Sequence, residues 1–296
     1  MSNSPNMGFA RRVGAGATAP STKEFEFLSC GVEKVAQHLQ SDGIRGIRGR
    51  QGESVVDGVY TVGGPLVLEP KPDEWGFWLL RMLGGGSNPN YTLAETVPDF
   101  VLDVEKGADV FRYAGMKVNT WSIRSAANQP VQLTLDLQGK TETGGITFPS
   151  ISGTLSLLQP YVHHNTAGAI TLGGVAYEAD NLEISGSNAL VLDRFLNSQT
   201  RTALPESDRI ITVAADFPFG DQTDALYNLA VAGLSSNSIV WTNGTYSLTL
   251  NFPKLQAPTS GPQINARTGE VMRRITFQAR RSGSSAECSA ANDETA

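Results

Sequence analysis

Apolar and polar residues alternate with a period of two through much of the chain. The clearest runs are Val131, Leu133, Leu135 and Leu137; Tyr246, Leu248, Leu250 and Phe252; and Ile275, Phe277 and Ala279. Because successive side chains of a strand point to opposite faces, each run predicts a strand with one face on a core. The chain is therefore expected to be mainly β.

Two local signals refine this pattern. Between Met116 and Ile123 the apolar phase slips, which predicts a bulge or two successive strands. Asn243-Gly244 separates two apolar runs and predicts a tight two-residue hairpin.

Two helices are expected within the β pattern. The first has an apolar stripe at helical spacing, with Asp73 as its expected cap and Gly84 as its end. That stripe consists of Trp75, Trp78, Leu79, Met82 and Leu83. The second helix is expected at about 222–232, after the cap Asp221 and before Gly233.

The two helices share their context. Each follows a strand that ends in proline, Pro70 or Pro218, and their expected caps lie half the chain length apart. Such a spacing favours tandem duplication of one domain. A second register, which matches 113–118 with 172–177, competes with it. Coincidence in a β-rich chain is the remaining alternative.

The sequence predicts four parts. Residues 1–20 are expected to be a flexible N-terminal arm and 282–296 a disordered C-terminal tail, because both have few large apolar residues. Between them lie two expected domains, 21–145 and 146–281. Thr141 to Gly153 is the expected linker.

Composition narrows the class of protein. The 296 residues carry a net charge of −6 and include no apolar run long enough for a signal peptide or membrane span. A soluble protein made in the cytosol, with no membrane partner, is expected. Cys30 and Cys288 lie far apart and are expected to be free thiols. The chain lacks the basic footprint of a specific nucleic-acid binder.

No catalytic, cofactor or metal site is predicted, and the chain is not expected to be an enzyme. His163 and His164 are adjacent, so in a strand they would point to opposite faces. Four aromatic residues, Trp75, Phe77, Trp78 and Trp121, would suit a sugar-binding platform, but the helical spacing of the first and third favours core packing. Phe77 falls off that stripe and is predicted to be a contact residue.

One local basic cluster is present, the sequence IRGIRGR from Ile44 to Arg50. It would suit a solvated loop, a phosphate-binding loop, or a loop that becomes ordered on assembly. Arginine favours interface ion pairs, glycine allows adaptation, and the two isoleucines would be apolar anchors. The candidate assembly interface therefore comprises Ile44, Arg45, Ile47, Arg48, Arg50 and Phe77.

Two longer stretches carry a family resemblance. From Cys30 to Gly86, a Gly/Arg-rich loop leads to a strand closed by Pro70 and then to a short aromatic helix stopped by three glycines. From Phe100 to Lys140 come a strand, an expected hairpin at Gly-Met-Lys-Val-Asn and a long strand. Both stretches resemble the major tail tube proteins of long-tailed (siphovirus-like) bacteriophages.

The resemblance implies a β-sandwich, barrel-forming tail tube fold with one packed helix per domain. It implies a virion protein of a non-contractile tail that self-assembles into stacked rings around a DNA-conducting lumen. Its implied partners are further copies of itself, the tape measure protein, the tail terminator and tail-tip proteins, and double-stranded DNA that passes without specific binding. Loops and the N-terminal arm would join subunits and successive rings.

Two questions remain open from the sequence. If the chain is duplicated, three two-domain subunits would form a ring; otherwise six subunits would. The alternative function is a β-sandwich carbohydrate-binding or adhesion module of a virion.

Overall fold

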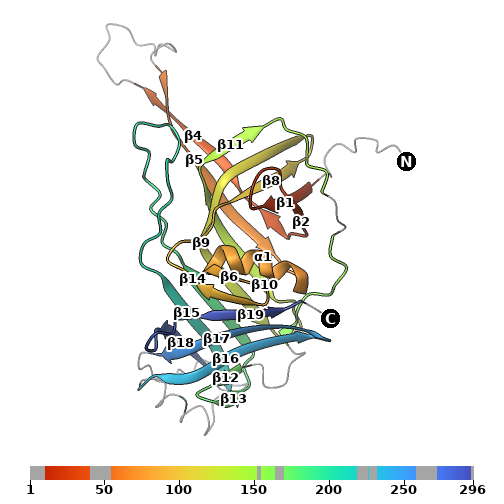
Figure 1. The fold of residues 1–296 in the computed structure, drawn as a ribbon, viewed down its shortest axis with the longest axis vertical. Helices are drawn as coiled ribbons and strands as arrows, with labels where there is room; N and C mark the ends of the chain where they lie inside the picture. Colours follow the sequence, from red (N-terminus) through yellow and green to blue (C-terminus); the bar gives the residue numbers. More distant parts are fainter. Residues whose placement is uncertain are drawn as a thin grey trace, which may run out of the picture.

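The computed structural model describes residues 11–40, 55–151, 155–163, 170–218, 226, 232–257 and 272–294. The protein is mainly β, as predicted, with the single described helix α1 (Pro72–Leu83) enclosed by strands (Figure 1). The strands of the first half are β1 (Arg11–Gly16), β2 (Lys23–Phe25), β3 (Ser29–Cys30), β4 (Glu33–Gln40), β5 (Val55–Leu68), β6 (Gly84–Ser87), β7 (Asn90–Leu93), β8 (Phe100–Lys106), β9 (Asp109–Ala126), β10 (Gln132–Gly139) and β11 (Thr141–Gly144). Those of the second half are β12 (Ile170–Leu172), β13 (Val175–Tyr177), β14 (Asn181–Ser187), β15 (Ile210–Pro218), β16 (Leu234–Asn243), β17 (Tyr246–Gln256), β18 (Met272–Arg280) and β19 (Ser289–Asp293).

The same pattern of antiparallel pairing occurs in both halves. In the first half β4 pairs with β5, β5 with β10, β10 with β9, and β9 with β8. In the second half β14 pairs with β15, β15 with β18, β18 with β17, and β17 with β16. In each half the second of these strands is followed by the segment in which a helix was predicted.

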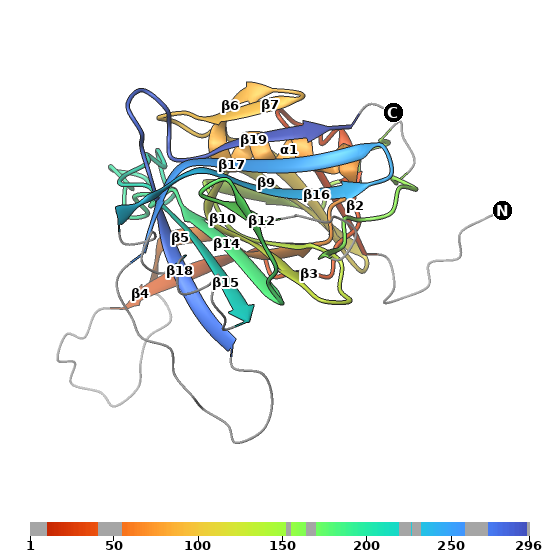
Figure 2. The same cartoon turned by 90° about the horizontal axis from the view of Figure 1, so that it is seen from below.

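Two strand pairings join the halves within the described residues. The end of β9 pairs with β14, so one sheet runs from β5 through β10, β9, β14 and β15 to β18. We call this the central sheet. The C-terminal strand β19 lies between β17 and β7 and thereby joins the second half to the first. Seen from below, α1 lies between the layer of β17, β19, β7 and β6 and the layer that contains β9 (Figure 2).

The predicted slip in β9 is a bulge. Thr120 pairs with Asp136 but Val118 pairs with Leu137, so Asn119 is the extra residue. Its side chain donates to Asp136 Oδ2 (2.8 Å) and accepts from the Leu190 amide (3.1 Å). The bulge keeps the apolar residues on both sides of it on the core face.

The hairpin expected at Gly-Met-Lys-Val-Asn is wrong. Residues 109–126 form one continuous strand, and the turn instead joins Lys106 to Asp109. Gly115 adopts a left-handed φ of 63° at a register shift against β8. There β9 exchanges its partner β8 for β14, so the glycine bends the strand rather than reversing it. The Asn243-Gly244 hairpin is confirmed, with Gly244 and Thr245 as its two turn residues.

Helix α1 supplies much of the core. Trp75, Trp78, Leu79, Met82 and Leu83 are all buried, which confirms the predicted stripe and its packing against the sheets. The helix begins at Pro72, one residue before the expected cap Asp73, and its N-cap is Lys71. The Lys71 amide donates to Glu74 Oε2 (2.9 Å), so the carboxylate three residues on satisfies this end. Gly84 ends the helix with a φ of 96°, as predicted.

The second predicted helix, 222–232, lies outside the described residues except at Leu226 and Ala232. Leu226 has helical backbone and is fully buried.

Both predicted flexible ends are partly wrong. Residues 11–16 form β1, which pairs with β2 and β8 and buries Val13 and Ala15. Residues 289–293 form β19, and Cys288 and Ala290 next to and within it are buried. Small apolar residues at alternate positions are sufficient where a neighbouring strand edge supplies backbone partners. Residues 1–10, 295 and 296 are outside the described part. Both cysteines, Cys30 and Cys288, are free thiols, as predicted.

The helix start holds a buried acid. Glu74 is 1% exposed, and burial raises its pKa to about 7, with the neighbouring Asp73 adding to the rise. Lys23 and Lys71 act in the opposite direction but do not reverse it. The folded protein therefore holds the Glu74 proton at pH values where the unfolded chain, with a pKa near 4.5, has lost it.

Replacement of Gly186 by alanine is expected to destabilise the protein by about 2 kcal/mol or more. A Cβ at this position of β14 would lie 2.3 Å from the Trp121 ring across the joint with β9. The free energy of unfolding in urea measures the effect. The matched control is Glu183→Ala on the same strand, whose side chain is half-exposed; equal losses in the two variants would contradict this account.

Glu74→Gln is expected to flatten the pH dependence of stability. In the parent, Glu74 contributes a loss of stability as pH rises from about 4.5 to 7, because the folded state binds its proton more tightly. The neutral amide removes this loss, which should be of the order of 1–3 kcal/mol. Urea unfolding between pH 4 and 8 measures it, with Glu178→Gln, at an exposed glutamate far along the chain, as control. A variant curve parallel to the parent's would refute the assignment.

Candidate assembly edge and channel face

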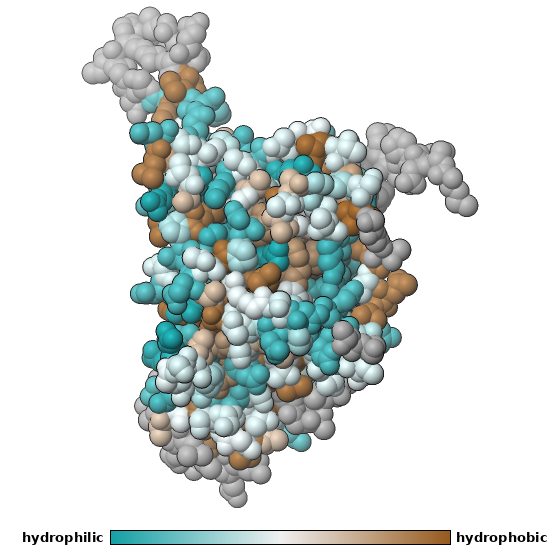
Figure 3. All heavy atoms as spheres, viewed as in Figure 1, coloured by the Kyte–Doolittle hydropathy of each residue, from teal (hydrophilic) through white to brown (hydrophobic). Residues whose placement is uncertain are grey.

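Strand β4 is a one-sided edge. It pairs with β5 along its length, and within the described residues its other edge carries no partner strand. The hairpin root of β4 and β5 projects from the body (Figure 1), and apolar residues lie along it (Figure 3). Val35, Leu39, Val55 and Val56 are 41–63% exposed there. An apolar strand edge left open on a monomer is a typical joining element.

The predicted interface residues separate in the structure. Ile44, Arg45, Ile47, Arg48 and Arg50 follow β4 but lie outside the described residues. Phe77 lies on α1, half-buried, with its ring 5.3 Å from Phe25 and 6.1 Å from Phe100. The Arg81 guanidinium lies 3.9 Å from the centre of the Phe77 ring. Phe77 therefore packs within its own chain, and its role in assembly stays a prediction.

The central sheet has one face on the core and one open face. On β10 the leucines at 133, 135 and 137 are buried, and Gln132, Thr134, Asp136 and Gln138 alternate with them on the open face. The open face is hollowed over the joint between the halves by a groove of about 440 Å³. Half of its lining residues carry hydroxyl groups, namely Thr120, Ser122, Thr134, Ser185, Ser187 and Thr212, and the others include the apolar Pro65, Trp121, Leu135 and Ile210.

Charges on the open face are sparse and only partly paired, because Arg124 and Arg280 are exposed there with no ion pair among the described residues. Arg274 contacts Glu183 (2.8 Å) and Asp216 (3.4 Å). Lys117 contacts Glu206 (2.7 Å) and also donates to the Leu204 carbonyl. Burial alone would raise the pKa of Glu206, but the hydrogen bonds from Lys117 and the Val97 amide lower it. The face thus offers phosphate few free cations.

The segment between β14 and β15, residues 188–209, packs across the first half. We call it the β14–β15 connector. Arg201 within it is 5% exposed and donates to the carbonyls of Val62 (3.1 Å), Gly139 (3.3 Å) and Leu192 (2.9 Å) and to the Gln138 side chain (3.0 Å). Burial lowers its pKa. Next to it, the Tyr60 amide donates to the Gln199 carbonyl. The connector therefore covers the end of the β5–β10 ladder.

A polar pocket of about 300 Å³ lies at the start of β15. Four carboxylates line it, Glu95, Glu206, Asp208 and Glu287, together with Arg209 and Arg281. Arg209 contacts Glu287 (3.4 Å) and donates to the Ala94 carbonyl. Glu95 and Asp208 are exposed, and no described residue pairs with either.

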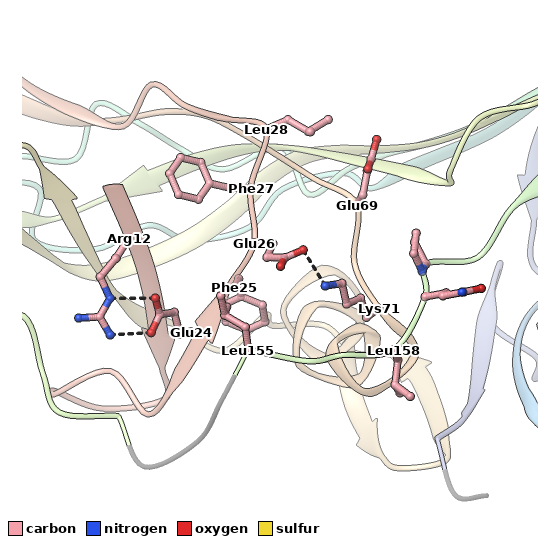
Figure 4. Close-up of a pocket in the computed structure, with 12 residues that line it drawn as sticks. Arg12, Glu24, Phe25, Glu26, Phe27, Leu28, Glu69, Lys71, Leu155 and Leu158 are labelled. Carbon is pink, nitrogen blue, oxygen red and sulfur yellow. Dashed lines mark hydrogen bonds and ion pairs between the residues drawn. The ribbon is translucent and has the colours of Figure 1, made fainter. Parts of the chain in front are cut away.

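A larger groove, of about 540 Å³, lies beside β2 (Figure 4). Its charged residues neutralise one another: Arg12 makes two hydrogen bonds to Glu24 (2.9 and 2.7 Å), and Lys71 contacts Glu26 (2.6 Å). Leu28, Leu155 and Leu158 add apolar surface. Because most of its charges already have partners, the groove does not favour a charged small ligand.

The described residues hold one arrangement that resembles catalytic chemistry. Ser125 Oγ lies 2.8 Å from His163 Nδ1, and His163 Nε2 lies 2.7 Å from the Ala179 carbonyl. Ser125 is fully buried and also accepts a hydrogen bond from Trp241 Nε1. A nucleophile must reach its substrate, so this chain of hydrogen bonds is structural. His164 lies outside the described residues.

Other classes of site find little support within the described part of the chain. No three side chains of metal-ligating type converge there. Trp75, Trp78 and Trp121 are buried, so these rings form core and not a sugar-binding platform. None of the described helices is long and apolar enough to cross a membrane.

Sequence reasoning missed several of these features. The lone Arg201 gave no sign of burial, because three of its four partners are main-chain or amide oxygens contributed by distant segments. In the sequence, the open face corresponds only to the polar residues at every second position of each predicted strand. Which of those polar residues share a groove depends on pairing between strands far apart in sequence.

Comparison with known proteins now adds to the geometry. No curated protein sequence matches the chain. The family model described as phage tail tube protein matches residues 6–279, which is nearly the whole chain. This match agrees with the mainly β sandwich and with the resemblance found in the sequence, and the chain belongs to the phage tail tube protein family.

Proposed function

We propose that this chain is a tail tube subunit that assembles through its sheet edges into closed rings, which stack into a DNA-conducting tube. The observation that carries the proposal is a difference within the repeated strand pattern. Strand β14 has a partner on both edges, whereas its counterpart β4 has a described partner on one edge only. Strand β14 is the first strand of the repeated pattern in the second half, and it pairs with β9 of the first half. Strand β4 occupies the same place in the first half, and its outer edge has no partner in the described chain.

A neighbouring copy supplies that partner in the proposed ring. The counterpart of β9 in the second half is β17. The end of β9 that pairs with β14 corresponds, in sequence, to the residues that follow Gln256 of β17. Each copy would then add its β4 to the far end of another copy's sheet. This contact is heterologous, joining two different surfaces, and such contacts close into rings. Closure removes the open edges.

The repeat also supports a specific stoichiometry. Two domains in tandem, 21–145 and 146–281, would supply two wall segments, so three copies would supply the six of a ring of single-domain subunits. The shared pairing pattern supports the alignment of the halves through Pro70 and Pro218, which was the register that placed the two expected helices in equivalent positions.

The open face of the central sheet is the proposed wall of the lumen. Its hydroxyl and amide groups are neutral, and two of its cations, Lys117 and Arg274, contact carboxylates, whereas Arg124 and Arg280 are exposed without such a contact among the described residues. Duplex DNA is held by proteins mainly through cations that neutralise phosphates, so such a wall would let DNA slide. The further proposed partners are the tape measure protein inside the tube and the terminator and tail-tip proteins at its ends.

Native mass spectrometry of isolated rings tests the assembly. We expect rings of three copies of 31.6 kDa each. Six copies would contradict the tandem arrangement, and a sharp monomer at high concentration, even with tail-tip components added, would contradict the tube function.

An edge variant provides a matched comparison for the same measurement. Val35→Lys with Leu39→Lys places two charges on the exposed edge strand β4 and should abolish rings, while monomer stability changes by about 0.5 kcal/mol or less. The control is Leu157→Lys, at a residue that is 93% exposed outside β4. Normal rings from the β4 variant would exclude this edge.

Lysines on the open face should convert the wall into a DNA-binding surface. Assembled protein is expected to bind duplex DNA weakly, with a shallow salt dependence. Thr134→Lys with Thr212→Lys should strengthen binding and steepen the salt slope, because new cations face the phosphates. Fluorescence anisotropy between 50 and 200 mM salt measures both. Tight, steeply salt-dependent binding by the parent would contradict the conduit.

A further inference from the structure

We propose that the end of the β15–β18 ladder is a docking surface for the β4–β5 loop, residues 41–54, of a second copy of this chain. The inference rests on the proposed ring and identifies a side-chain contact that would lock it. The β14–β15 connector provides the template, because it makes the corresponding contact within one chain.

The template contact is an arginine placed on a ladder end. Val62 and Gly139 form the last pair of the β5–β10 ladder. Arg201 donates to both of their carbonyls and to the Gln138 side chain. Val62 is 1% exposed as a result of this packing and that of the sheet. The connector comes from the second half, so it fastens the second half to the first in addition to the β9–β14 pairing.

The equivalent end of the second half is uncovered. In the shared pattern β15 corresponds to β5 and β18 to β10, so Ile210 and Arg280 lie at the matching end. Ile210 is 51% exposed and Arg280 is exposed. The described chain has no segment left to cover this end in the way the connector covers the first. Within the repeat, the segment equivalent to the connector is the one between β4 and β5.

Charge supports the same occupant. The β4–β5 loop contains Arg45, Arg48 and Arg50 between two isoleucines. The uncovered ladder end adjoins the 300 Å³ pocket in which Glu95 and Asp208 are exposed and no described residue pairs with them. Arg209 and Arg281 also line this pocket; Arg209 contacts Glu287. Arginine hydrogen bonds to carboxylates are stronger than those that Arg201 makes to neutral carbonyls.

In the proposed contact, the arginines and the isoleucines of the β4–β5 loop have different roles. An arginine enters beside Glu95 and Asp208, and Ile44 or Ile47 covers Ile210, the exposed apolar residue at the ladder end. The contact is lateral, between neighbours in one ring, because its template joins two halves that lie side by side in one sheet. The acidic residues alone would not identify a site; the repeat does.

A charge exchange tests the contact. The first variant is Glu95→Lys with Asp208→Lys, and the second is Arg45→Glu with Arg48→Glu and Arg50→Glu. Each should lower the yield of closed rings by more than about tenfold, since charged hydrogen bonds are lost and like charges face each other. Combining all five substitutions should restore rings to within a few-fold of the parent. Native mass spectrometry counts the rings, and thermal melting confirms that each monomer is folded.

The control variant makes the same change in charge as the Glu95→Lys, Asp208→Lys variant, but at two acids away from the proposed contact. Asp109→Lys with Glu178→Lys alters two exposed acids on other surfaces and should leave ring yield unchanged. Rings that persist in either single set, or that fail to return in the combined variant, overturn the docking contact. In both cases ring formation by the parent shows that the proposed function stands. A parent that forms no rings would overturn both proposals.

Discussion

The antiparallel pairing of β9 with β14 is the contact on which the rest of the structure depends. Strand β9 carries the first half of the sheet on β10 and β11, and its far edge receives the second half. Without this ladder two sandwiches would each expose a row of unpaired backbone groups. The close approach of Gly186 to the Trp121 ring shows that the joint is packed as well as hydrogen-bonded. Side chains at the joint therefore restrict the register that backbone pairing alone would allow.

The geometry of β9 follows from two irregularities. Gly115 bends the strand where β8 leaves it, and the bulge at Asn119 resets its phase before β14 begins. The side chain and carbonyl of Asn119 then bind Leu190, Asp136 and Asn188, so the bulge also fixes the start of the β14–β15 connector. One extra residue thus positions both the strand that continues the sheet and the segment that carries Arg201. Bulges commonly re-aim a strand in this way.

The sequence predicted the elements better than it predicted their arrangement. Alternation at Leu133, Leu135 and Leu137 and the stripe at Trp75 and Trp78 depend on local periodicity, and both were correct. The strand at residues 289–293 was not predicted, because its stability comes from β17 and β7, which lie far away in sequence. Arg201 was missed for the same reason. Of the candidate interface, the loop 44–50 was singled out by composition, but only the topology relates it to the connector of the second half.

The proposed tube wall would have to satisfy two requirements that oppose each other. Its subunits would have to attract one another strongly, and its inner face would have to attract DNA weakly. In this chain the residues suited to each requirement lie in different places. The central strands present Thr134, Ser185 and Thr212 toward the groove, while buried or partnered cations such as Arg201 and Lys117 contact the connector or lie within it. Arg201 and Lys117 thus lie where chain segments meet, in direct contact with their hydrogen-bond partners. Because screened interactions beyond about 10 Å contribute little, cations held in this way attract phosphate far less than free lysines on the face would.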